Sequence, residues 1–251
     1  MPLELQTEFR CTEMAMLTAN HLSDQSRARV ILMLGAPGSG KGTQSSWLSK
    51  QFGIPRLSTG EILRTEAKRN TPAGFRLRQI LATGALVDDD MVCAVVGARL
   101  QREKPENGLI LDGFPRTVQQ ACFLDSLLAD LGLPRPTVID LEISKEGLLR
   151  RLAGRRQCAV CGSVYNLISR PSRRGSRCET DGGALVQRDD DTEGVILHRM
   201  EEYEAFSAPL IDYYKTANYH RVTADRDVNA IAKDLLSALS MPARFTLSSA
   251  A

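Results

Sequence analysis

Short apolar runs alternate with amphipathic stretches along this chain. Four apolar runs predict strands, and the first three are mainly apolar on both faces, as in the covered strands of a parallel sheet. These runs lie at 29–35 (RVILMLG), 108–116 (GLILDGFPR, which ends in a carboxylate and a turn), 137–144 and 219–224.

Helical periodicity fills most of the chain between the predicted strands. The stretch KGTQSSWLSKQFG, directly after the first strand, predicts a helix that Gly53 ends. The predicted helices lie at 41–53, 61–70, 74–84, 88–103, 118–132, 145–156, 192–214 and 228–239. Because strands alternate with helices, the pattern indicates an α/β domain built around a parallel sheet.

Three stretches depart from this alternation. Residues 157–191 hold cysteines, glycines and Pro171 with few helical signals, so they predict a small inserted domain. The first 28 residues are of mixed polarity and predict a disordered, dispensable leader, with Met14 and Met16 as alternative starts. Residues 241–251 predict a frayed tail.

Composition and charge exclude several classes of protein. The chain has 251 residues, of which 43% are hydrophobic and 25% charged, and its formal net charge is +2. That balance is typical of a soluble globular protein and points neither to nucleic acid nor to a membrane as a partner. The leader lacks the basic start and apolar core of a signal peptide, and its acids (Glu4, Glu8 and Glu13) oppose a transit peptide. We therefore expect a cytoplasmic protein.

The sequence GAPGSGKGTQ at 35–44 fits the phosphate-loop pattern GxxxxGK, except that Gly42 stands where Ser or Thr is usual. The strand before it and the helix after it are the context that the pattern requires. Glycines let backbone amides wrap an anion, and Lys41 is placed to reach the β- and γ-phosphates. Asp112, at the end of the second predicted strand, suits a carboxylate that acts on magnesium, with a purely structural cap as the alternative.

Five motifs in order carry a family resemblance: GAPGSGKGTQ, LSTGEILR, GALV, LILDGFPRT and QRDDD. In them the chain resembles the bacterial type of adenylate kinase, the long form with a large lid, over roughly 29–240. In that family the loop reads GKGT, which accounts for Gly42. The resemblance implies a P-loop NTPase-like core with a five-stranded parallel sheet, and transfer of a phosphoryl group from MgATP to AMP to give two ADP. The implied parts are a core (29–57, 88–153 and 192–240), an AMP-binding segment (58–87) and a lid (154–191).

The resemblance also implies roles for individual residues. The catalytic cations would be Lys41, Arg116, Arg151, Arg155, Arg188 and Arg199. The ATP site would use Gly38, Ser39, Gly40, Lys41, Gly42, Thr43, Arg151, Arg155, Val164, Tyr165 and Arg226. The AMP site would use Thr59, Arg64, Ala85, Leu86, Val87, Gly113, Phe114, Pro115, Arg116, Gln120, Arg188 and Arg199. Asp112 would hold magnesium through the water molecules around the ion.

Phosphoryl transfer agrees with this residue set, because it needs charge neutralisation and positioning more than covalent chemistry. Arginine forks can grip phosphates through two hydrogen bonds. Thr59 favours AMP, since the related uridylate and cytidylate kinases tend to carry a smaller residue there. Glu61 departs from the Asp that is frequent in the family, so it is left out of the predicted site.

Three of the six cysteines are clustered in the predicted lid, in CAVC (158–161) and CETD (178–181). Two such pairs at this separation suit one tetrahedral zinc ion with the ligands Cys158, Cys161, Cys178 and Asp181. All four positions come from protein, so the predicted site is structural. The resemblance supports zinc, and the alternative is a lid held by polar contacts alone.

Two other functions remain as alternatives. The first is a kinase for another nucleoside monophosphate, which a panel of acceptors would detect. The second is a zinc-ribbon protein that binds nucleic acid through the basic stretches RRQC and SRPSRRGSR. These stretches contain no aromatic residue, and Tyr165 is the one aromatic residue between them, which speaks against the second. We therefore expect ATP, AMP and ADP as the only partners, and the resemblance implies a monomer.

Overall fold

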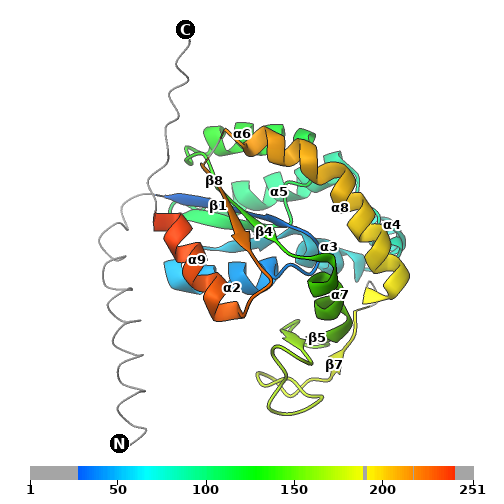
Figure 1. The fold of residues 1–251 in the computed structure, drawn as a ribbon. Helices are drawn as coiled ribbons and strands as arrows, with labels where there is room; N and C mark the ends of the chain where they lie inside the picture. Colours follow the sequence, from blue (N-terminus) through cyan, green and yellow to red (C-terminus); the bar gives the residue numbers. More distant parts are fainter. Residues whose placement is uncertain (1–27, 189–190, 217, 241–251) are drawn as a thin grey trace, which may run out of the picture.

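A computed structural model describes residues 28–188, 191–216 and 218–240 (Figure 1). The leader, apart from residue 28, and the tail lie outside the described residues, as do two aspartates of the QRDDD motif. The core is a five-stranded sheet in the order β2-β3-β1-β4-β8, with every neighbouring pair parallel. Its strands are β1 (Arg29–Gly35), β2 (Arg56–Ser58), β3 (Gly108–Asp112), β4 (Thr137–Glu142) and β8 (Asn218–Thr223). The predicted fold class is thus confirmed.

Alternate residues of the central strands enter two separate hydrophobic clusters. In β1, Ile31 and Met33 pack with α2 (Lys41–Phe52) and α9 (Val228–Ser240) on one face. Val30 and Leu32 pack on the other face, among residues of α5 (Asp89–Glu103), α6 (Val118–Asp130) and the end of α8 (Glu193–Tyr214). Because side chains alternate along a strand, an all-apolar run is what a sheet covered on both faces requires.

Two short helices, α3 (Thr59–Ala67) and α4 (Pro72–Thr83), follow β2 and pack against each other. Thr71 caps α4 by accepting a hydrogen bond from the Gly74 N–H at 3.0 Å, and Gly84 ends the helix at φ 80°. Helix α4 also contacts α8 (Figure 1). These contacts place the α3–α4 pair beside the carboxyl end of the sheet, where β2 and β3 end.

The helix predicted at 145–156 is too long, because α7 (Lys145–Gly154) ends two residues earlier. The next residues form β5 (Arg155–Cys158) in a small antiparallel sheet with β6 (Val164–Asn166) and β7 (Leu185–Val186). The Leu167 N–H donates to the Gly154 carbonyl at 2.8 Å, and Asn166 Nδ2 donates to the Arg151 carbonyl at 2.9 Å. Hydrogen bonds from the inserted segment therefore cap α7 at the point where β5 begins. Figure 1 shows the small antiparallel sheet beyond the end of α7.

Candidate active site

The phosphate loop joins the carboxyl end of β1 to the first residue of α2. Gly38 and Gly40 take φ values of 88° and 104°, which residues with a Cβ rarely adopt. A Cβ on Gly38 would lie 2.7 Å from Leu152 Cγ, so the loop packs directly on α7. Gly40 caps α2 without a side-chain hydrogen bond. The first N–H groups of α2 therefore face the loop, as an anion site at a helix N-terminus requires.

Lys41 folds back over this loop. Its ammonium group donates to the carbonyls of Gly35 at 2.5 Å and Ala36 at 2.8 Å. The pKa of Lys41 is lowered from 10.5 to about 8, chiefly by burial; Asp112 opposes this shift, and Arg116 contributes to it. The lysine is thus a partly buried cation whose charge is costly until an anion enters the loop.

Gly42 faces an acidic and a basic side chain. A Cβ on Gly42 would lie 3.4 Å from Asp112 Oδ2 and 3.6 Å from Arg56 Nη1. The same Asp112 oxygen accepts a hydrogen bond from Ser45 Oγ at 3.3 Å and lies 3.3 Å from Arg56 Nη1. A side chain at 42 would therefore lie in contact with both Asp112 and Arg56.

One cleft of about 1960 Å³ collects all six predicted catalytic cations. Single ligand pockets have volumes of roughly 300–1,000 Å³, so the cleft has room for two nucleotides. Its lining also includes the predicted ATP-site residues Gly38, Gly40, Gly42, Thr43, Val164, Tyr165 and Arg226, as well as Asp112. Ser39 is fully buried below the loop, and its carbonyl accepts a hydrogen bond from Arg151 Nη1 at 2.8 Å.

Asp191 organises two of these cations. Its carboxylate is buried and receives two hydrogen bonds from Arg155, one of them from Nε at 2.7 Å. Arg199 Nη1 lies 3.9 Å from the same carboxylate. Sequence analysis missed this role, although Asp191 is the last residue of the QRDDD motif that carried the resemblance. Arg188 is held differently, because its Nε donates to Gln157 Oε1 at 2.5 Å.

A smaller pocket of about 50 Å³ adjoins the cleft and gathers most of the predicted AMP site. Its lining includes Thr59, Arg64, Ala85, Leu86, Val87, Gly113, Arg116, Gln120 and Arg199. Pro115 lines the main cleft instead. The Phe114 side chain is fully buried in the core, so it supports the turn from below.

Gln120 is oriented by its neighbours in this pocket. Its Oε1 accepts the Arg116 N–H at 2.8 Å, and its Nε2 donates to Asp89 Oδ1 at 2.7 Å. Thr59 Oγ1 donates to the Gly113 carbonyl at 2.8 Å, which ties α3 to the turn after β3. Asp89 is a further supporting residue that sequence analysis missed, and the acidic start of its helix was the available signal.

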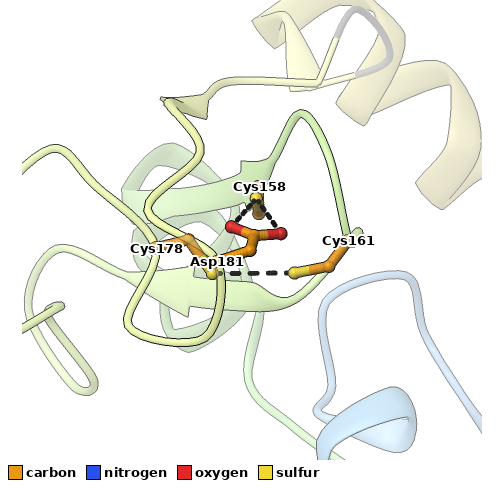
Figure 2. Close-up of side chains that lie close together, drawn as sticks. All are labelled: Cys158, Cys161, Cys178 and Asp181. Atoms are coloured by element: carbon orange, nitrogen blue, oxygen red, sulfur yellow. Dashed lines mark hydrogen bonds between the residues drawn. The ribbon is translucent and has the colours of Figure 1, made fainter.

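The four predicted metal ligands lie together in the lid (Figure 2). One potential ligand atom from each of Cys158, Cys161, Cys178 and Asp181 lies within 4.8 Å of the others. The sulfurs of Cys161 and Cys178 are 3.6 Å apart, and Asp181 Oδ1 lies 3.2 Å from Cys158 Sγ. Zinc–sulfur bonds of about 2.3 Å in a tetrahedron place sulfurs roughly 3.8 Å apart. The cluster is therefore compatible with a structural metal ion.

Hydrogen bonds around the cluster favour the ligating, deprotonated forms of Cys178 and Asp181, whereas Cys158 is shifted in the other direction. The Tyr165 hydroxyl lies 3.4 Å from Cys178 Sγ, and this contact lowers the pKa of Cys178 to about 7. The Gly183 N–H donates to Asp181 Oδ1 at 2.8 Å and holds the pKa of that carboxyl below its usual range. Burial raises the pKa of Cys158. Tyr165 thus supports the cluster with its hydroxyl, a role that sequence analysis missed.

A parallel sheet, a phosphate loop at its carboxyl edge and a cleft lined by cations together define a P-loop phosphotransferase for nucleotides. The family model described as adenylate kinase matches residues 33–219. This chain belongs to the adenylate kinase family, as the sequence motifs predicted.

Several bacterial adenylate kinases are similar to this chain over nearly their whole length. The adenylate kinase of Geobacter sp. (strain M21) is 46% identical over 210 residues, which cover 83% of this chain and 98% of that protein. The one from Caldicellulosiruptor bescii is 42% identical over 212 residues (84% and 99%). The one from Bacillus subtilis (strain 168) is 40% identical over 213 residues (83% and 98%). Among the described residues, none of the helices combines the length and the apolar character that a bilayer span needs.

Proposed function

We propose that this chain catalyses the reversible transfer of a phosphoryl group from MgATP to AMP, which gives two ADP. The observation that carries the proposal is the single cleft that the phosphate loop, Lys41 and five arginines line together. Phosphoryl transfer concentrates negative charge on the transferred group and on the oxygens at either side of it. Preorganised cations stabilise that charge without reorganisation during the reaction, which is the main contribution a protein makes to this chemistry.

On the donor side, we assign the ATP phosphates to the backbone between Gly38 and Thr43 and to Lys41. The backbone N–H groups at the start of α2 and the positive end of its dipole favour the anion. Arg151 is fixed by the carbonyls of Ser39 and Arg226, so its position relative to the loop is set before a nucleotide binds. Val164, Tyr165 and Arg226, at the outer part of the cleft, would lie near the ATP base.

On the acceptor side, we assign AMP to the smaller pocket and the adjoining wall of the cleft. Gln120 has one N–H and one lone pair of its amide left for an adenine edge, because Asp89 and the Arg116 N–H occupy the others. Arg64 and Arg116 would contact the AMP phosphate, together with Arg188 and Arg199, and Thr59 would contribute to the choice of AMP. Backbone from Ala85 to Val87 and the turn from Gly113 to Arg116 would complete the site.

Magnesium would accompany ATP and neutralise charge on its phosphates. The residues present fit this cation, since the carboxylate of Asp112 lines the cleft directly beside Gly42. Asp112 would hold the ion through water molecules, because magnesium dehydrates reluctantly and keeps several waters in such sites. With no hydroxyl at 42, charge neutralisation rests more heavily on Lys41 and the arginines.

In the lid, we propose a structural zinc ion bound by Cys158, Cys161, Cys178 and Asp181. The distances within the cluster and the hydrogen bonds that favour deprotonated ligands support this assignment. Zinc would stabilise a segment whose own buried apolar cluster is small. We further propose that the chain divides into a core, an AMP-binding segment at 58–87 and a lid at 154–191. We also propose that the protein is monomeric and cytoplasmic.

A coupled assay for ADP formation tests the proposed function. Purified protein with MgATP is offered AMP, UMP, CMP and GMP in separate reactions, and we expect AMP to give the highest kcat/KM. UMP or CMP in first place would instead identify a kinase for another nucleoside monophosphate. No transfer to any acceptor by a protein with a normal melting transition would contradict the proposal as a whole.

A further inference from the structure

Arg56, the first residue of β2, reaches three parts of the active site. Its Nη1 donates to the Gly42 carbonyl at 3.2 Å and lies 3.3 Å from Asp112 Oδ2, while its Nη2 forms an ion pair with Glu61. The Arg56 side chain is 16% exposed, and all three partners line the main cleft with it. The guanidinium therefore connects the start of α2, the end of β3 and the first turn of α3.

This arginine changes the charge that the site presents to a cation. Asp112 and Glu61 are the two carboxylates that Arg56 contacts in the cleft, and alone they would carry two negative charges. With Arg56 between them the net charge of the three side chains is one negative charge. The Asp112 side chain is 10% exposed and the Glu61 side chain is 52% exposed. The Arg56–Glu61 ion pair is therefore more accessible to solvent than the Arg56–Asp112 ion pair.

We propose that Arg56 is a positioning residue that limits how much magnesium strengthens nucleotide binding, because it holds the Glu61 carboxylate and partly neutralises Asp112. The inference rests on the proposed function, since it concerns the same nucleotide site. A carboxylate that accepts hydrogen bonds from a guanidinium has fewer lone pairs for the water molecules around a metal ion. The positive charge of Arg56 also attracts nucleotide phosphates when no metal accompanies them.

The test compares the affinity for a non-hydrolysable ATP analogue with Mg²⁺ and with a chelator in place of Mg²⁺, by isothermal titration calorimetry. The metal effect is the ratio of the two dissociation constants, without metal over with metal. In Arg56→Gln we expect this ratio to rise about three- to tenfold, the scale of one unit charge in a partly solvated site. An unchanged or lower ratio in a folded Arg56→Gln protein would overturn the proposal.

Two matched variants make the outcome specific. Arg69→Gln removes a surface arginine that also forms an ion pair with a glutamate. Arg69 lies 3.0 Å from Glu66, and its side chain is 65% exposed. We expect Arg69→Gln to leave the ratio unchanged. Arg56→Lys keeps the charge without the fork of donors, and we expect a ratio closer to the native protein than to Arg56→Gln.

A double-mutant cycle with Glu61→Gln separates the holding of Glu61 from a general charge effect. In the native background, where Arg56 holds Glu61, we expect Glu61→Gln to change the ratio less than twofold. In the Arg56→Gln background the same change should remove most of the gain. Equal effects of Glu61→Gln in both backgrounds would overturn the proposal. A threefold drop from Glu61→Gln alone would overturn it even if Arg56→Gln failed to fold.

The same titrations distinguish this inference from the function on which it rests. A native protein that binds the analogue in neither condition would contradict the proposed function and this inference together. A native protein that binds the analogue and transfers phosphoryl groups to AMP, with the same metal effect in Arg56→Gln, would contradict only the inference.

Discussion

The phosphate loop rises from a sheet whose two faces are buried under helices, whereas the lid rests on a far smaller apolar cluster. The loop follows β1, in which every residue after the first is buried. The buried cluster of the lid consists of Cys158, Tyr165 and Cys178, with Leu185 packed against it. Two of those residues are also predicted metal ligands. The phosphate loop is thus supported by a large packed core, whereas the folding of the lid depends on the same side chains that are predicted to bind the metal.

This difference predicts different responses to substitution. Loss of the Lys41 charge should alter chemistry more than stability, because the sheet below the phosphate loop is packed independently of Lys41. Changes at the lid cluster should alter stability first, because a small segment without its own core needs a further constraint to stay folded. The experiments below test this comparison, from the largest expected effect to the smallest.

Lys41→Met should reduce kcat about 10²- to 10³-fold, the usual cost of losing one preorganised group that stabilises developing negative charge. Its melting temperature should not fall, because burial lowers the pKa of Lys41 and the buried charge therefore costs stability at neutral pH. Steady-state kinetics and differential scanning calorimetry measure both effects. Lys233→Met, at an exposed position of α9, is the control. Near-normal turnover would remove Lys41 from the mechanism.

Cys161→Ser should lower the bound zinc below one per chain and the melting temperature by about 5–10 °C. The estimate assumes that the free energy of unfolding falls by about 2–3 kcal/mol. For a protein of this size each kcal/mol lowers the melting temperature by roughly 2–4 °C. Elemental analysis and calorimetry are the measurements. Cys122→Ser changes an exposed cysteine outside the lid and should change neither quantity. Unchanged zinc content in Cys161→Ser would contradict the proposed ligand set. It would also contradict the proposed difference between a packed core and a lid that depends on its metal ligands.

Gly38→Ala should destabilise the protein by about 1–2 kcal/mol more than Gly53→Ala. Both glycines have positive φ, 88° and 65°, so both substitutions strain the backbone. A Cβ at Gly38 would lie 2.7 Å from Leu152 Cγ, whereas no described atom lies within 4 Å of a Cβ at Gly53. The difference in the free energy of unfolding, from urea titrations, therefore isolates the packing of the loop on α7. Equal destabilisation by Gly38→Ala and Gly53→Ala would show that α7 shifts to accommodate the added methyl group at little cost.

The affinity for a non-hydrolysable ATP analogue should weaken about fivefold between pH 8 and pH 9. The pKa of Lys41 is lowered to about 8 in the folded protein, so the lysine loses its proton over this range and phosphates lose a charged partner. The same shift makes the folded state hold fewer protons than the unfolded state between pH 8 and pH 10.5, so stability rises with pH there. Calorimetric titration measures the affinity. In Lys41→Met the dependence should vanish, and its persistence would assign the titration to another group.

The sequence was sufficient for the parts of this protein that short-range rules govern. The apolar runs of β1, β3 and β4 identified buried parallel strands, and the glycine pattern at 35–44 identified a phosphate loop between a strand and a helix. The prediction of the family and of a five-stranded sheet was confirmed. The three-residue strand β2 was missed, since a run of three residues carries no periodicity that distinguishes it from a loop.

The tertiary structure alone decided which polar groups support one another. Arg56, Asp89 and Asp191 lie outside the predicted site, yet each contacts a predicted site residue across 31 to 56 positions of sequence. Helix periodicity at 145–156 gave no sign that hydrogen bonds from Asn166 and Leu167 would end α7 at Gly154. Local patterns of residues determined the strands β1, β3 and β4 and the phosphate loop, because those features depend on neighbours in the chain. The candidate cations followed from the family resemblance of the motifs. The orientation of each charged side chain depends on partners that only the folded chain brings within a few ångströms.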